Sequence, residues 1–252
     1  MTLHIIGIGL DSEKDITVKG LELVQKSELV YLEVYTSKLH CPFINLAKLY
    51  GKQITLADRA MVEGDNNEIL EHAKTMDVAF LIIGDPFSAT THLDMMMRAK
   101  KEGIAVTVTN NASILTAVGI TGLQLYKFGK TTSVPYPEEN FQPETAYEVI
   151  AQNKKNGLHT LVLLDIKQDQ QRFMSVNEAL TILLAIEEKR GENIFPSSTL
   201  CVGCARLGSQ DPTIIAGTAQ ELLAKDFGLP LHCLLVPGNL HFMEEEAMGM
   251  WR

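Results

Sequence analysis

The sequence predicts an α/β protein of two domains, with a mostly parallel N-terminal sheet, a mixed C-terminal sheet and helices on both faces. In the first half, short β-branched apolar runs alternate with amphipathic stretches, which is typical of a parallel sheet wrapped by helices. A region rich in Gly and Pro, residues 119–143, then interrupts this alternation. Beyond it, two strand-like runs follow each other without a helix between them, which indicates a mixed sheet. We therefore expect domains at residues 1–122 and 123–252.

The first domain is expected to consist of alternating strands and helices. Apolar, β-branched runs bounded by turns or charges predict strands at residues 3–9, 29–34, 52–56, 78–84 and 104–109. Apolar residues at three- and four-residue spacing predict helices at 17–26, 42–50, 66–74 and 90–101. Thr90 and Thr91 are expected to cap the last of these helices and Gly103 to end it, while residues 111–113 cap the next.

The second domain is predicted from the same signals. Strands are expected at residues 131–134, 160–165, 199–206, 213–218 and 231–236. Helices are expected at residues 144–156, 176–190 and 219–225.

The composition excludes several classes of partner. With 46% apolar and 21% charged residues, the 252-residue chain is expected to fold as a globular protein. Its net charge is −9 and its Lys and Arg residues are scattered, whereas a nucleic-acid groove normally carries a basic stripe, so we expect no nucleic-acid partner. The longest apolar runs have the length of strands, so no membrane association is expected.

The cysteines indicate the compartment. The N-terminus has no basic region and no small-residue cleavage site, so it does not resemble a secretory signal. Four cysteines in such a chain indicate reduced thiols and a cytoplasmic protein. Cys201 and Cys204 have CxxC spacing, but in a strand residues three apart face opposite sides. We interpret them as buried structural cysteines rather than as a redox or metal pair.

The first candidate motif is GIGLDS, residues 7–12, directly after the first predicted strand. It matches the start of a dinucleotide fingerprint, but Ser12 occupies the position of the third glycine. Glu33 would bind ribose hydroxyls in that scheme, and the alternative is a tight turn with an unrelated acid. In either case the glycines indicate that chain or ligand approaches this backbone closely.

The second motif is IIGDPFSATTH, residues 82–92, where a strand ends in a polar turn. Ligands of open α/β sheets sit beyond the carboxyl ends of strands, which is where Asp85 and Ser88 are expected. Asp85 either accepts hydrogen bonds from a ligand or caps the turn. His92, in the first turn of the following helix, is interpreted as structural.

The third motif is TNNASILTAVG, residues 109–119, again a strand end that leads into a helix. Free backbone N–H groups at such a position favour a carboxylate or another anion. Ser113 would bind such a group or cap the helix.

Further strand ends in the second domain supply Leu164, Asp165 and His232. A cleft between the two domains explains this convergence better than any single motif does. His232 alone, on an apolar strand, is more typical of a half-buried structural histidine than of a catalyst.

The sequence lacks the motifs of several common enzyme mechanisms. The sequence contains no Ser-His-Asp order, no zinc-ligand spacing and no GxxxxGK[ST] loop, so we expect neither a protein nucleophile nor a metal. Methyl transfer fits this pattern, because a sulfonium donor supplies the reactivity and the protein chiefly aligns donor and acceptor.

Long stretches of the chain resemble the diphthine synthase family of the tetrapyrrole methylase superfamily. The matching strings run in order along nearly the whole chain, and they are GIGLDSEKDITVKGLE, GDPFSATTH, AVGITGLQLYKFGKT, VPYPEEN, GLHTLVLLDIK and VPGNLHFMEEE. The resemblance implies a tetrapyrrole-methylase-like fold of two α/β domains with S-adenosyl-L-methionine in the cleft between them. It also makes Glu33 a surface or structural acid.

The family's cofactor positions map onto eight residues of this chain. By resemblance, the cofactor-binding residues are Leu10, Asp85, Ser88, Ser113, Ile114, Leu164, Leu207 and His232. Ser88 departs from the apolar residue that is usual in the family, which leaves a backbone contact there. No catalytic base and no metal ligand is assigned.

The resemblance also implies a substrate and partners. The expected reaction trimethylates the amino group of the 3-amino-3-carboxypropyl chain on a modified histidine of translation elongation factor 2, and it leaves S-adenosyl-L-homocysteine. A homodimer is expected. The alternatives are a corrin or porphyrin methylase, which the absence of a GxGPGDP loop after the first strand disfavours, and a non-catalytic module that binds S-adenosylmethionine.

Overall fold

The computed structural model describes residues 1–64, 67–139 and 142–252. The chain forms two compact units, Met1–Ile114 and Leu115–Arg252, and each is described by itself. The boundary predicted from the sequence, after residue 122, lies further along the chain than this division after Ile114. Residues 121 and 122 pack with the second unit: Trp251 Nε1 donates to the carbonyl of Thr121 at 3.0 Å, and Gly122 packs against Ala247. Asn66, the predicted start of a helix, and Asn140, the last residue of the VPYPEEN string, lie outside the described residues.

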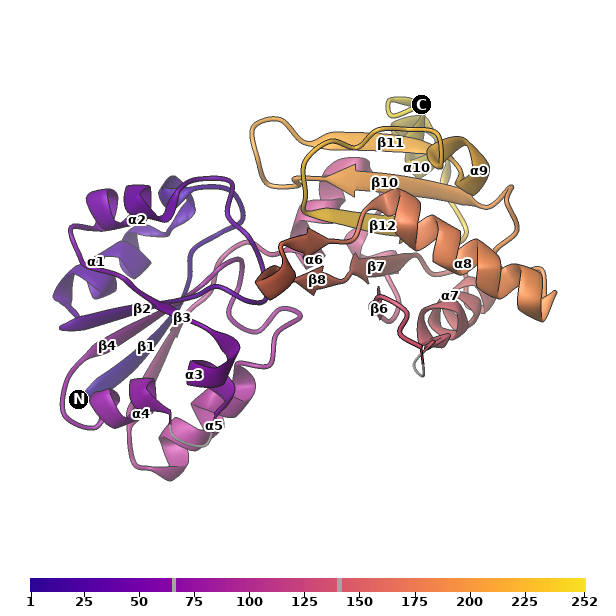
Figure 1. Cartoon of the computed structure of the whole chain (residues 1–252). Helices are drawn as coiled ribbons and strands as arrows, with labels where there is room; N and C mark the ends of the chain where they lie inside the picture. Colours follow the sequence, from indigo (N-terminus) through magenta and orange to yellow (C-terminus); the bar gives the residue numbers. More distant parts are fainter. Residues whose placement is uncertain (65–66, 140–141) are drawn as a thin grey trace. The chain divides into compact units, whose positions relative to one another are not determined.

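The first unit is built on a five-stranded sheet in the order β3-β2-β4-β1-β5, in which every neighbouring pair is parallel. Figure 1 shows helices on both faces of this sheet. The strands are β1 (Thr2–Gly7), β2 (Leu29–Glu33), β3 (Thr55–Ala57), β4 (Val78–Ile82) and β5 (Ala105–Thr109). The helices are η1 (Glu13–Asp15), α1 (Val18–Lys26), α2 (Phe43–Tyr50), α3 (Arg59–Glu63), α4 (Glu68–Ala73) and α5 (Leu93–Lys101), and α6 (Ile114–Ala117) follows β5.

Alternate residues of the central strands point to opposite faces of the sheet and pack into two separate hydrophobic cores. Leu3 and Phe80 belong to the core under α3, α4 and α5, whereas Ile6 and Leu81 belong to the core under α1 and α2. A strand with both faces covered is apolar at every position, which is why residues 78–83 form an unbroken apolar run. The prediction of a parallel sheet wrapped by helices is confirmed.

The second unit contains a mixed five-stranded sheet in the order β11-β10-β12-β7-β6. Among the described strands of this sheet, β6 and β7 pair in parallel and the other neighbours are antiparallel; β10 and β11 are the two strands predicted to follow each other without a helix between them. The strands are β6 (Thr132–Val134), β7 (Thr160–Leu164), β8 (Ile166–Lys167), β9 (Arg172–Phe173), β10 (Leu200–Ala205), β11 (Thr213–Thr218) and β12 (His232–Val236). The helices are η2 (Val118–Thr121), η3 (Leu125–Lys127), α7 (Thr145–Lys155), η4 (Gln168–Gln170), α8 (Val176–Arg190), α9 (Ala219–Leu222) and α10 (Phe242–Gly249).

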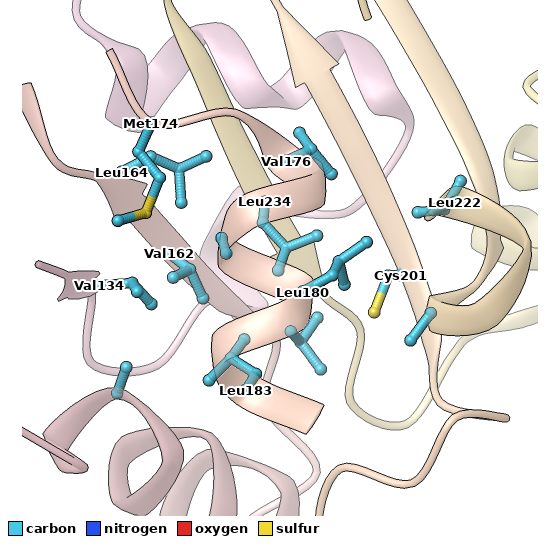
Figure 2. Close-up of a cluster of buried hydrophobic side chains, with 14 of the residues drawn as sticks. Val134, Val162, Leu164, Met174, Val176, Leu180, Leu183, Cys201, Leu222 and Leu234 are labelled. Carbon is cyan, nitrogen blue, oxygen red and sulfur yellow. The ribbon is translucent and has the colours of Figure 1, made fainter. Parts of the chain in front are cut away.

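One face of this second sheet packs on α7, α8 and α9. Figure 2 shows Leu180 and Leu183 of α8 over Val162 and Leu234 of the sheet. Each of these four side chains is fully buried. At about 25 cal/mol per Å² of apolar surface, burial of each contributes roughly 1.5–3 kcal/mol, so this face anchors the unit.

Some local predictions are wrong. Helix α5 begins after His92 and has no side-chain cap, whereas the hydroxyls of Thr90 and Thr91 donate to the Pro86 carbonyl and to the Glu63 carboxylate. Gly103 does end α5, with a positive φ of 75°. Sequence patterns did not predict α3, β8, β9, α10 or the short 3-10 helices, because each is too short or too weakly amphipathic to show a period. Within the described residues, no helix has the length and apolarity that crossing a bilayer requires.

The buried imidazole of His92 is expected to make stability depend on pH. Its ring lies edge-on to Phe80 and Tyr35, and burial lowers its pKa from 6.5 to about 4. The pKa of His92 is lower in the folded than in the unfolded protein. Its contribution to stability is therefore complete above pH 6.5 and is lost as the pH falls toward 4. His92→Phe keeps the ring and removes the titration. We expect its free energy of unfolding to fall less than that of the wild type between pH 7 and pH 5, by up to about 1.4 kcal/mol per pH unit. Parallel pH profiles in urea denaturation would contradict this assignment.

Candidate functional site

The loops after β1 and β4 are joined directly by their backbones. Gly9 N donates to the Gly84 carbonyl at 3.3 Å, and Gly84 N donates to the Gly9 carbonyl at 2.7 Å. Both glycines have positive φ, 81° and 85°. A Cβ on Gly7 would lie 2.6 Å from the Gly84 carbonyl oxygen, which no side chain tolerates. The close approach that the glycines indicated is therefore an approach of chain to chain.

Ser12, which stands where a dinucleotide fingerprint has its third glycine, caps η1 instead. Its side chain accepts from Lys14 N at 3.4 Å, and Asp15 completes a capping box. The Asp15 carboxylate accepts from the backbone N–H groups of Asp11 and Ser12 at 2.8 and 3.0 Å. Residues 8–15 thus form a loop fastened by its own cap.

Glu33 is a structural acid, fully buried at the end of β2. Its Oε1 accepts from the N–H groups of Tyr35 and Thr36, and its Oε2 accepts from the Thr36 hydroxyl at 2.6 Å. Burial raises the pKa of this carboxyl, although these hydrogen bonds oppose the rise. With both oxygens used within the chain, Glu33 has no role toward a ribose.

The Asp85 carboxylate is saturated by donors of the protein itself. Oδ1 accepts from Phe87 N at 3.0 Å and from the Ser88 hydroxyl at 3.1 Å. Oδ2 accepts from Asn110 Nδ2 at 2.9 Å and from Asn111 N at 3.2 Å. Burial alone would raise the pKa of Asp85, but the donated hydrogen bonds outweigh it and lower the pKa. A carboxylate accepts about four hydrogen bonds, so this one is fully occupied.

The other predicted cofactor residues of the first unit lie on the same three loops. Leu10 is half-buried, and its Cδ2 lies 3.6 Å from the position of a Cβ on Gly84. Ser113 is buried directly before α6, and Ile114, the first residue of that helix, is half-buried. The structure therefore brings Leu10, Asp85, Ser88, Ser113 and Ile114 to the carboxyl edge of one sheet.

The predicted residues of the second unit also gather at one sheet edge. In the strand register, Cys233 pairs with Leu163 and Ala205 pairs with His232. Leu164 and His232 therefore lie abreast on neighbouring strands, with Leu207 two residues beyond the end of β10. Leu164 and Leu207 are 7% and 6% exposed, so little of either side chain reaches beyond the core.

His232 uses both of its ring nitrogens within the second unit. Nδ1 accepts from Val176 N at 3.3 Å, so Nε2 carries the proton and donates to the carbonyls of Gly228 and Leu229 at 3.1 Å. Burial lowers the pKa of this imidazole and keeps it neutral. The ring fastens the start of α8 to the loop before β12, and only the backbone of His232 remains for a ligand.

The cysteines are structural, as interpreted from the sequence. Cys201 packs into the core under α8, as Figure 2 shows, and burial raises its pKa to about 12. Cys204, on the opposite side of β10, is paired across the sheet with Cys233. Both are buried and all four thiols are free. A buried thiol with a raised pKa is not a nucleophile at neutral pH. In the described part of the chain, no group of three or more His, Cys, Asp or Glu residues is arranged to hold a metal.

Asn110 and Asn111 have roles at this edge that were not predicted from the sequence. Asn111 Nδ2 donates to the carbonyls of Gly7 and Asp15, both at 3.0 Å, and so ties the first loop to the third. The signal was present, because two consecutive asparagines at the end of a parallel strand place amide donors at the ligand-binding edge.

Comparison with known proteins identifies the family. The tetrapyrrole (corrin/porphyrin) methylase family matches residues 2–223 of the chain. A diphthine synthase of Methanococcus aeolicus is 50% identical, with 97% of this chain and 95% of the relative covered. The chain belongs to the diphthine synthase family. It is an enzyme, a methyltransferase of the tetrapyrrole methylase fold, as the resemblance implied.

Further members support this assignment at full length. A diphthine methyl ester synthase of Dictyostelium discoideum is 45% identical, covering 100% of this chain and 98% of the relative. A crystal structure of an Entamoeba histolytica protein described as a diphthine synthase superposes with a TM-score of 0.93 at 43% identity, covering 99% of this chain and 98% of that one. The diphthine synthase family therefore accounts for both units.

Proposed function

We propose that this protein is a diphthine synthase, which transfers methyl groups from S-adenosyl-L-methionine to the modified histidine of translation elongation factor 2. The acceptor is the amino group of the 3-amino-3-carboxypropyl chain, and the product is its trimethylammonio form. The single observation that carries the proposal is the similarity at about half of all positions to diphthine synthases, over nearly the whole of both chains. S-adenosyl-L-homocysteine is the second product.

The cofactor is proposed to lie against the loops that carry Leu10, Asp85, Ser88, Ser113, Ile114, Leu164, Leu207 and His232. Four of these are leucine or isoleucine, and the half-buried side chains of Leu10 and Ile114 would exclude water from the donor. Asp85 and His232 would contact the cofactor through their backbones, because their side chains are occupied within the protein. The expected cleft shared by the two domains stays a prediction, and a crystal structure with S-adenosyl-L-homocysteine tests it directly.

S-adenosyl-L-methionine supplies an electrophilic methyl group, so the chain's task is to hold the acceptor amine in line and unprotonated. The amine is protonated in water at neutral pH and has to lose that proton before it attacks, and removal from water lowers its pKa. Neither Asp85 nor His232 acts as the base in this geometry, since both are fully hydrogen-bonded. We therefore propose that the amine reaches the site as the free base or releases its proton to water.

The proposed partners follow from the same assignment. Elongation factor 2 is the protein substrate, the enzyme forms a homodimer, and it acts in the cytoplasm. We propose no membrane association and no nucleic-acid partner. The net charge of −9 supports the absence of a nucleic-acid partner.

The deciding experiment offers the enzyme labelled S-adenosyl-L-methionine and elongation factor 2 that carries the unmethylated 3-amino-3-carboxypropyl histidine. Label is expected on this factor and not on a control factor with unmodified histidine. Intact mass then counts the methyl groups, which separates trimethylation from a further methyl ester. Label on precorrins but not on the factor would favour a corrin or porphyrin methylase. Absence of cofactor binding in calorimetric titration would refute the proposal and its non-catalytic alternative together.

A further inference from the structure

Three separate loops of the first unit meet at one asparagine. The Asn111 side chain donates from Nδ2 to the carbonyl of Gly7, at the end of β1, and to that of Asp15, at the end of η1. Its backbone N–H donates to the Asp85 carboxylate in the loop after β4. Asn111 itself belongs to the loop after β5.

The packing around Asn111 requires the glycine beside it. A Cβ on Gly7 would lie 3.0 Å from the Cβ of Asn111 and 2.9 Å from Cδ of Pro86. The absence of a side chain at position 7 thus lets both loops approach the end of β1. Asn111 Oδ1 accepts from Ala112 N at 2.7 Å, which fixes the amide with its Nδ2 toward the two carbonyls.

Asp85 completes the connection between the second and third loops. Its four donors come in two pairs, Phe87 and Ser88 from its own loop, Asn110 and Asn111 from the loop after β5. The carboxylate therefore holds two loops at a fixed separation and has no acceptor capacity left for a ligand.

We propose that Asn111 is the positioning residue of the cofactor edge: together with Asp85 it locks the three loops into the binding geometry before S-adenosyl-L-methionine arrives. The inference rests on the proposed function, since that cofactor is the ligand concerned. A prearranged site binds more tightly, because no loop has to be ordered on binding. Asp85 then acts on the cofactor through the loops that it holds rather than as a direct ligand of its side chain.

The test compares Asn111→Ala and Asn111→Asp with the wild type in calorimetric titration with S-adenosyl-L-methionine. Asn111→Asp keeps the shape and the acceptor of Ala112 N but loses both donated hydrogen bonds and turns a carboxylate oxygen toward the two carbonyls, so a loss at least as large as in Asn111→Ala would assign the effect to these bonds. We expect cofactor affinity to fall about tenfold or more in both, corresponding to one or two hydrogen bonds. The KM for the modified elongation factor is expected to change far less.

Asn153 provides a matched structural control in the second unit. Its amide also makes three hydrogen bonds, with Lys130 N, the Lys130 carbonyl and the Thr160 hydroxyl at 2.9–3.1 Å. Asn153→Ala is expected to lower the melting temperature but to leave cofactor affinity unchanged, well below that temperature. If Asn153→Ala weakens cofactor binding as much as Asn111→Ala does, the role of Asn111 is general stability and the inference fails.

Hydrogen–deuterium exchange separates positioning from direct contact. In the cofactor-free protein, amides of residues 8–15 are expected to exchange faster in both Asn111 variants than in the wild type. Weaker binding with unchanged exchange would make Asn111 a direct ligand and overturn the proposal. Unchanged affinity while the wild type binds would overturn it too, whereas a wild type that binds no cofactor would instead refute the proposed function.

Asp85→Asn gives a second, independent variant in case the Asn111 changes impair folding. In this variant an NH₂ group replaces one carboxylate oxygen and faces two hydrogen-bond donors that it cannot accept from. Cofactor affinity is therefore expected to fall in this variant as well. Asp85 and Asn111 belong to one hydrogen-bond network, so their effects are not independent. The double variant Asp85→Asn/Asn111→Ala is therefore expected to lose less cofactor affinity than the product of the two single losses. Fully multiplicative losses would show that the two residues act separately.

Discussion

Replacement of Glu244 with alanine is expected to lower the free energy of unfolding by about 3–5 kcal/mol. The residue is fully buried at the start of α10. Its Oε1 accepts from Gln124 N and from His159 Nε2, both at 2.9 Å. Its Oε2 accepts from Lys127 Nζ and from His241 N. Removing the carboxylate leaves these donors without their partner.

The chemistry of His159 makes the network specific. Gly238 N donates to Nδ1 at 2.9 Å, so the proton resides on Nε2, which donates to Glu244. Burial lowers the pKa of His159, which keeps the imidazole neutral beside the cation of Lys127. Glu244 therefore pairs with one cation, Lys127, and three neutral donors, and it fastens α10 to η3 and to the start of β7.

The pH dependence of this network provides a second measurement. Burial acts to raise the pKa of Glu244, but the donated hydrogen bonds outweigh it and lower the pKa from 4.5 to about 2. Since the folded pKa is the lower one, the contribution is full above pH 4.5 and is lost as the pH falls toward 2. Glu244→Gln, which has the same shape, is expected to be less stable at pH 7 and to lack this part of the acid transition.

Glu245 serves as the control for Glu244, because it follows directly in α10 and is exposed. Glu245→Ala is expected to change stability by no more than about 0.5 kcal/mol. Chemical denaturation at pH 7 measures all three variants. If Glu244→Ala and Glu245→Ala are equally stable, the buried network does not hold α10.

Gly9→Ala is expected to weaken cofactor binding strongly. A Cβ there would lie 2.4 Å from the Cβ of Asp15, and the φ of 81° is unfavourable for any L side chain. Relief of the clash has to move the 8–15 loop and break its pairing with Gly84. We expect a loss of about 3 kcal/mol or more in stability and at least about a tenfold loss of affinity for S-adenosyl-L-methionine.

Gly51 is the matched control, because it shares the conformation without the contact. Its φ is 68°, and nothing lies within 4 Å of a Cβ built there. Gly51→Ala is expected to cost about 1–2 kcal/mol of stability through backbone strain alone and to leave cofactor affinity unchanged. The difference between the two variants measures the steric term. Equal behaviour of the pair would show that the contact with Asp15 is readily relieved.

The candidate site shows how far sequence reasoning reaches. Period and turn signals located the three loops after β1, β4 and β5, because carboxyl ends of parallel strands share one edge. The same signals could not assign the donors of Asp85. Whether a carboxylate points at a ligand or at Asn110 depends on contacts between residues 25 positions apart. His232 was similarly ambiguous until the donor of Val176 occupied its Nδ1.

By itself, the sequence determined the α/β class, the parallel and mixed sheets, the buried cysteines and the family, because apolar period and ordered motifs are local properties of the chain. Only the tertiary structure decided that Glu33 and Asp85 are occupied by the protein's own donors, that Asn111 joins three loops and that α10 is anchored by Glu244. The physical reason is that a hydrogen bond to a buried group is chosen by what folding brings within about 3 Å, and chain spacing carries no record of that choice.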